Sequence, residues 1–126
     1  MKLDTKPTAE LLVALWKEVA ELIRTGSVEQ LAAKFSYGVR SDRETVAAIR
    51  EDLARSLRVV EEHQLAPAGA AVLPTVIFYA PNDSHLIAAA DGKLFLAPEG
   101  FMGFSLVVFG ESGSYHVSLE SIDAVA

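Results

Sequence analysis

This chain of 126 residues lacks cysteine, long apolar runs and, in its second half, basic residues. Without cysteine there are no disulfide bonds, no thiolate nucleophile and no cysteine-ligated zinc. The apolar run near the N-terminus, residues 11–16, is closed by Lys17 and Glu18. A run of this length is too short for the core of a signal peptide or for a membrane span. These features together predict a cytoplasmic protein.

Basic residues nearly disappear after residue 58. Between Val59 and Ala126, Lys93 is the one basic residue against eight acids, and the whole chain has a formal net charge of −6 at pH 7. Proteins bind nucleic acids and anionic membranes through clustered Lys and Arg. The charge distribution therefore predicts no nucleic-acid or membrane partner and favours a basic protein partner.

The remaining composition is that of a folded domain. Hydrophobic residues make up 51% of the chain. A chain of this length normally forms one domain and buries roughly two-thirds of the surface that its unfolded state exposes. We therefore expect a single domain over residues 1–126.

The first 58 residues carry three helical patterns. Apolar residues follow the 3.6-residue period over residues 8–24, with Thr8 as a plausible N-cap and Gly26 just beyond the C-terminus. Ser27–Gln30 and Ser41–Glu44 have capping-box spacing. The first box predicts a short helix to about residue 36. The second predicts a longer helix with an apolar face of Val46, Ile49, Leu53 and Leu57.

From about residue 58 the apolar period changes from 3.6 to 2, which indicates strands. The expected strands are 75–80, 85–90, 93–97, 104–109 and 115–122. Asp91-Gly92 lies between two apolar runs and favours a two-residue hairpin turn. The prediction is an α+β fold with helices over about 8–57 and a sheet over about 58–123. Three N-terminal helices would pack on a C-terminal antiparallel β-meander of four to six strands.

Two of the expected strands are apolar on both faces. Ile77 and Tyr79 alternate with Val76 and Phe78. In the 104–109 segment, Val107 and Phe109 oppose Phe104, Leu106 and Val108. Three helices cover only one face of a sheet. Either the sheet curls to enclose its other face, or a partner, such as a second copy in a homodimer, covers it.

No constellation of residues predicts a reaction. The three histidines, His63, His85 and His116, have no metal-ligand spacing, and the glycine pairs around Phe101 and Ser112 suit turns better than phosphate loops. Adjacent acids such as Glu61 and Glu62 point to opposite faces of a strand. We therefore predict no catalytic residue, no metal and no cofactor, and do not expect an enzyme.

Acidic and apolar residues near the turns are better candidates for contact with a protein. Phe101 and Met102 follow a predicted turn and are flanked by acids, which is the composition of a binding hot spot with a charged rim. The predicted partner-binding residues are Glu61, Glu62, Asp83, Glu99, Phe101, Met102, Glu111 and Glu120.

The C-terminal segment resembles the closing hairpin of small bacterial proteins of uncharacterised function. The resemblance lies in Glu99-Gly100, the strand from Phe104 to Val108 and the segment Tyr115–Asp123, together with the short helix after Gly26-Ser27. Acidic, cysteine-free chains of this size are also similar in type to cytosolic immunity proteins, which bind and block one cognate toxin. This likeness implies a non-enzymatic protein that occludes the basic active-site cleft of a bacterial toxin.

The alternative is a nuclear-transport-factor-like domain with a ligand pocket. Three helices before a curved sheet, at about this length, suit that fold. Its pocket would lie between the helices and the sheet, would be lined by Trp16, Phe35, Phe78 and Phe104, and would bind or isomerise a small apolar ligand.

Overall fold

The computed structural model describes residues 1–38, 42–59, 64–65, 72–97, 101–111 and 113–125. It has three helices in the N-terminal half and a β-meander in the C-terminal half, which confirms the predicted α+β fold. The helices are α1 (Ala9–Arg24), α2 (Val28–Lys34) and α3 (Thr45–Val59). The long strands are β4 (Val72–Phe78), β5 (Leu86–Ala97), β6 (Phe101–Glu111) and β7 (Ser114–Val125). The two-residue strands are β1 (Lys2–Leu3), β2 (Ser36–Tyr37) and β3 (Gln64–Leu65).

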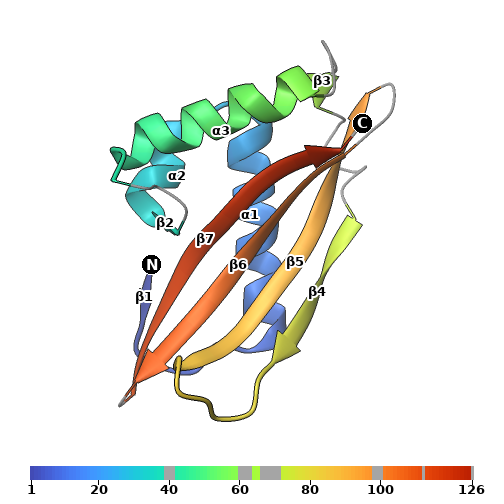
Figure 1. The fold of residues 1–126 in the computed structure, drawn as a ribbon. Coiled ribbons are helices and arrows are strands. Elements are labelled where there is room, and N and C mark those ends of the chain that lie inside the picture. Colours follow the sequence, from blue (N-terminus) through green and yellow to red (C-terminus); the bar gives the residue numbers. More distant parts are fainter. Residues whose placement is uncertain (39–41, 60–63, 66–71, 98–100, 112, 126) are drawn as a thin grey trace.

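The four long strands pair antiparallel in the order β4-β5-β6-β7. The free side of β7 is covered by β1, which pairs antiparallel with it, and by β2, which pairs parallel. At the other side of the sheet β4 is an edge strand, and β3 pairs with the far end of β5. Figure 1 shows the helices on one face of this twisted sheet, with α1 running behind the strands and α3 crossing near the end of β7.

The caps of the helices agree only in part with the sequence. Thr8 caps α1, since its Oγ1 accepts a hydrogen bond from the Leu11 amide, and Gly26 follows the C-cap with a φ of +72°. Ser27 precedes α2 but makes no side-chain cap hydrogen bond. The predicted capping box at Ser41–Glu44 is wrong. Glu44 is not the third residue of the helix but precedes it, and its carboxylate accepts hydrogen bonds from the amides of Val46 and Ala47. The helix therefore starts at Thr45, and Ser41 lies outside the described residues.

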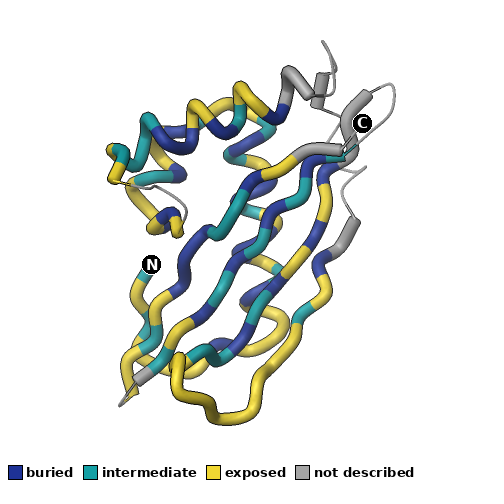
Figure 2. Tube along the Cα trace, viewed as in Figure 1, coloured by how far each residue is buried: buried dark blue, intermediate teal, exposed yellow. Residues whose placement is uncertain are grey.

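The core lies between α1 and the concave face of the sheet. On β6, Met102, Phe104, Leu106 and Val108 are buried, and on β7 Val117, Leu119 and Ile122 are buried. Figure 2 shows the resulting alternation of buried and less buried residues along the strands. In β7 the alternation shifts by one residue, because Leu119 pairs with Leu106 and Ile122 with Phe104. This bulge places Ile122 on the helix side.

Trp16 is the centre of this core. Its side chain is fully buried, its ring stacks on Phe104 at a centroid distance of 4.5 Å, and its Nε1 donates to the Phe104 carbonyl at 3.1 Å. A Cβ on Gly92 would lie 2.6 Å from Cζ2 of Trp16. The predicted hairpin at Asp91-Gly92 is therefore wrong: both residues are inside β5, and Gly92 makes room for the indole ring.

Candidate binding surface

The face of the sheet turned away from the helices is the main exposed surface of the described strands. Phe104, Leu106 and Val108 of β6 face the core, so Val107 and Phe109 face outward, as the sequence predicts. In the described part of the chain no helix packs on this face. Of the two alternatives that the sequence leaves open, enclosure of the outer apolar face by the sheet itself is not supported in the described part of the chain, since Phe109 is 40% exposed.

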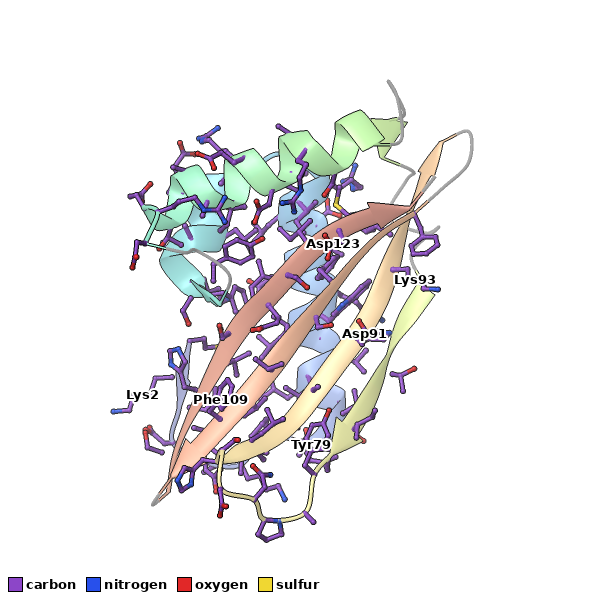
Figure 3. The ribbon with its side chains drawn as sticks, in the orientation of Figure 1. Lys2, Tyr79, Asp91, Lys93, Phe109 and Asp123 are labelled. Carbon is purple, nitrogen blue, oxygen red and sulfur yellow. The ribbon has the colours of Figure 1, made fainter. Side chains whose placement is uncertain are left out.

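The half of this face near the β4–β5 loop is apolar. We call five outward-facing residues the apolar patch; they are Ile77, Tyr79, Ala89, Val107 and Phe109. Ile77 pairs with Ala89 and Ala89 with Val107, so these residues form one row across three strands. Ile77 is 49% exposed and Tyr79 42% exposed. Figure 3 shows Tyr79 and Phe109 at this end of the sheet.

The other half of the same face is polar. Ser105 donates a hydrogen bond to Oδ1 of Asp91 across the strands at 2.7 Å. Lys93 lies over the ring of Phe101, with its Nζ 4.3 Å from the ring centroid. Asp123 forms an ion pair with Arg55 at 3.6 Å. The charged side chains of this half already contact other groups of the same chain. In the described structure, the apolar patch is therefore the part of the face that is left to contact another molecule.

The predicted contact residues that the structure describes do not form one surface. Asp83 is exposed in the β4–β5 loop and Glu111 ends β6, so both belong to the end of the sheet that carries the apolar patch. Phe101 begins β6 at the opposite end, about 33 Å away at the rise of an extended strand. Glu120 is half-buried on β7, against Gly38. Glu61, Glu62 and Glu99 lie outside the described residues.

The predicted role of Met102 as a partner-binding residue is wrong. The sequence predicts that Met102 lies beside Phe101 at a turn, but β6 already begins at Phe101 and Met102 points into the core, where it is fully buried. Neighbouring residues of a strand point to opposite faces, so Phe101 and Met102 cannot act together as an anchor. The sequence contained the better signal, namely the second apolar face of the strands at 75–80 and 104–109.

A second cluster lies where α3 meets β2. Asp52 is almost completely buried and accepts hydrogen bonds from the Tyr37 hydroxyl at 2.5 Å and from Nη1 of Arg43 at 3.1 Å. Arg55 lies 3.5 Å from the same carboxylate. Beside Asp52 lies a shallow pocket of about 340 Å³, which is lined by Arg43, Glu51, Asp52, Ala54 and Arg55.

The protonation of this cluster is fixed by its contacts. Burial alone would raise the pKa of Asp52, but the hydrogen bonds from Arg43 and Tyr37 outweigh it, so the pKa lies below its ordinary value. Burial and the hydrogen bond to Asp52 raise the pKa of Tyr37. An ionised carboxylate with donors on both oxygens is a poor proton acceptor. The cluster is therefore better suited to holding α3 against β2 than to acid–base chemistry.

The other polar candidates are also accounted for. His116 Nε2 lies 2.6 Å from Ser36 Oγ, and burial lowers the pKa of His116. His85 lies in the exposed β4–β5 loop with a φ of +56°, and His63 is outside the described residues. Among the described residues no three His, Asp or Glu side chains are grouped closely enough to hold a metal ion.

The alternative ligand pocket is also not formed as expected. Trp16 and Phe104 stack directly on each other, and Phe35 is buried in the same core. Phe78 does not line an interior space: it is 42% exposed, and Lys6 Nζ lies 5.4 Å from its ring.

Comparisons of the chain with protein-family models, with curated proteins and with solved structures find no match. Within the described residues, no helix is long and apolar enough to cross a membrane.

Proposed function

We propose that the protein is a non-enzymatic binding module that contacts a basic partner protein through its apolar patch. The observation that carries the proposal is the exposure of Ile77, Tyr79 and Phe109, at 40–49%, on one continuous part of an uncovered sheet face. Exposed apolar residues grouped in this way are typical of protein-binding surfaces.

The chemistry of the partner is inferred from charge. The chain carries a net charge of −6, and Asp83 and Glu111 belong to the end of the sheet that carries the patch. A partner with an apolar centre and a basic rim would match this surface. The apolar contacts would supply most of the affinity, and the charges would speed association and select the partner.

The narrower form of the proposal is an immunity protein that neutralises a cognate bacterial toxin. It is supported by the acidic character of the second half of the chain, which would complement the basic cleft of an enzyme that acts on nucleic acid. Relative to the sequence-based hypothesis, the anchors move from Phe101 and Met102 to the apolar patch.

We predict that Phe109→Glu abolishes capture of the partner while Leu11→Glu does not. Leu11 is the matched control, because it is 39% exposed on α1 and Phe109 is 40% exposed on the open face. Each substitution places the same charge at an equally exposed apolar position. The measurement is affinity capture from a lysate of the source organism with both variants and the unmodified protein, followed by mass spectrometry.

Salt and toxicity then separate the general proposal from its narrower form. Capture that weakens as ionic strength rises supports a charge-guided partner. If that partner arrests growth when expressed alone, and co-expression of the protein but not of Phe109→Glu relieves the arrest, it is a toxin. Equal capture by both variants, or equal loss, contradicts binding through the apolar patch.

A further inference from the structure

The loop between β4 and β5, residues 80–85, is exposed along its whole length and is nevertheless closely held. The Nδ2 atom of Asn82 donates to the carbonyls of Ala80 and Leu86 at 2.9 and 2.8 Å. Its Oδ1 atom accepts from the amides of Ser84 and Leu86 at 3.1 and 3.2 Å. These bonds use the full hydrogen-bonding capacity of an amide side chain. A single residue therefore ties the two ends of the loop together.

The end of the loop is also fixed through its backbone. His85 has a φ of +56°, a left-handed conformation that residues other than glycine adopt infrequently. Such a conformation persists only where the surrounding contacts determine it. Here the His85 amide donates to the Asn82 carbonyl at 3.2 Å, and the His85 carbonyl accepts from the Gly110 amide of β6 at 2.9 Å. The second bond fixes the loop to a neighbouring strand.

These bonds hold the loop beside the apolar patch. The loop begins directly after Tyr79 and ends directly before Leu86, which pairs with Phe109. Tyr79 and Phe109 belong to the patch, and Figure 3 shows both at this end of the sheet. A loop that is already ordered loses little conformational freedom when a partner binds. The β4–β5 loop can therefore extend the binding surface with little loss of entropy.

Asp83 carries the negative charge of this loop. It is exposed, and among the described residues it is in no ion pair. Two acids of the other half of the open face differ in this respect, because Asp91 accepts a hydrogen bond from Ser105 and Asp123 pairs with Arg55. The carboxylate of Asp83 is therefore left to contact another molecule.

We propose that the β4–β5 loop is a preformed part of the binding surface, in which Asp83 receives a lysine or arginine side chain of the partner. Asn82 is the positioning residue, because its bonds hold the loop and leave it no capacity for a partner. This inference rests on the proposed function, since it names the charged contact beside the apolar patch. A cationic side chain at this place matches the net charge of −6 and a partner with a basic rim.

Hydrogen exchange of the purified protein tests whether Asn82 holds the loop. We expect Asn82→Ala to speed exchange of the Gly110 amide by about tenfold or more, although this amide bonds to His85 and not to Asn82. Amides within α1 should keep their protection, since the fold stays intact. Asp83→Ala is the control, and it should leave exchange at Gly110 unchanged. Equal exchange at Gly110 in the two variants overturns the positioning role of Asn82.

The association rate tests the charged contact, with the protein that the unmodified chain captures, once purified, as the probe. Asp83→Asn should slow association by about twofold or more at low ionic strength and reduce its salt dependence. Glu10→Gln is the control, because Glu10 is also exposed and without an ion pair among the described residues, but belongs to α1.

A double substitution distinguishes positioning from a purely structural role. In the Asn82→Ala background, Asp83→Asn should change the association rate little, because the carboxylate is no longer held in place. If Asn82 only stabilises the fold, Asp83→Asn has the same effect in both backgrounds. Equal effects would overturn the coupling between the two residues.

The outcomes separate this inference from the proposed function. If Phe109→Glu abolishes capture while Asp83→Asn and Glu10→Gln slow association equally, the apolar patch binds the partner and the contact at Asp83 is wrong. If no partner is captured, or if Phe109→Glu leaves capture unchanged, the proposed function fails and the contact at Asp83 fails with it. The exchange result at Gly110 stands in both cases, because it is obtained without a partner.

Discussion

Replacing Trp16 by alanine should lower the free energy of unfolding by about 3–5 kcal/mol, the range for truncating a large buried aromatic residue. Trp16 is fully buried, stacks on Phe104 and donates its indole hydrogen to the Phe104 carbonyl. Truncation would remove the stack and leave that carbonyl without its donor. Because whole domains are stable by about 5–15 kcal/mol, the loss is a large fraction of the total. Urea unfolding followed by circular dichroism measures it.

Gly92→Ala tests whether Trp16 really fills the space over β5. A methyl group there would collide with Cζ2 of Trp16, so we expect a loss of about 1–3 kcal/mol from overpacking. In the Trp16→Ala background the same methyl enters vacated space, and the loss should largely disappear. Gly103→Ala is the control, since a Cβ there would lie 3.8 Å from the nearest atom, the Gly92 carbonyl oxygen. Equal effects of Gly92→Ala in both backgrounds would contradict this packing.

Removing the Asp52 carboxylate should be the second large effect. Asp52→Ala would leave the buried Tyr37 hydroxyl without its acceptor and Arg43 without its main partner, at a cost of about 3 kcal/mol. Asp123→Ala is the control: Asp123 also pairs with Arg55 but is highly exposed, so its loss should cost less than about 1 kcal/mol. Equal effects of the two substitutions would show that Asp52 is not a buried anchor.

The same cluster predicts the pH dependence of stability. The pKa of Asp52 is lower in the folded protein than in the unfolded chain, where it is about 3.9. The ionised carboxylate therefore stabilises the fold fully above the unfolded-state pKa, and this stabilisation is lost as the pH falls through the folded-state pKa. The difference in unfolding free energy between the unmodified protein and Asp52→Asn should therefore shrink below about pH 4. The pKa of Tyr37 is raised, so its contribution declines above about pH 10, and Tyr37→Phe should lack that decline. If the unfolding free energies of all three proteins changed with pH in parallel, Asp52 and Tyr37 would not have the shifted pKa values that this account requires.

The periodicity of the sequence predicts the fold well because both halves have strong patterns. The 3.6-residue repeat of residues 8–24 is that of α1, and the alternation in residues 104–109 correctly separates the buried Phe104 and Leu106 from the outward Val107. Local turn chemistry was a poorer guide at Gly92. An Asp-Gly pair normally marks a hairpin, but here a tertiary contact, the indole of Trp16, decides the role of the glycine.

The binding surface could be predicted only in part. The sequence shows that the strands have a second apolar face, yet it does not give strand register or bounds. Extending β6 by three residues beyond the predicted strand moved Met102 from a turn into the core. Likewise, the register of β4, β5 and β6 is what brings Ile77, Ala89 and Val107 into one row. Pairing between distant segments is not encoded in local periodicity, so the apolar patch appears only in the folded chain.

The most direct test of the binding surface is hydroxyl-radical labelling of the protein alone and in its captured complex. Tyr79 and Phe109 belong to the apolar patch, whereas Leu11 is almost equally exposed on α1. Binding through the patch predicts that Tyr79 and Phe109 lose most of their labelling in the complex while Leu11 keeps its own. Unchanged labelling of Phe109 in a stoichiometric complex would contradict the central claim and place the partner on another surface.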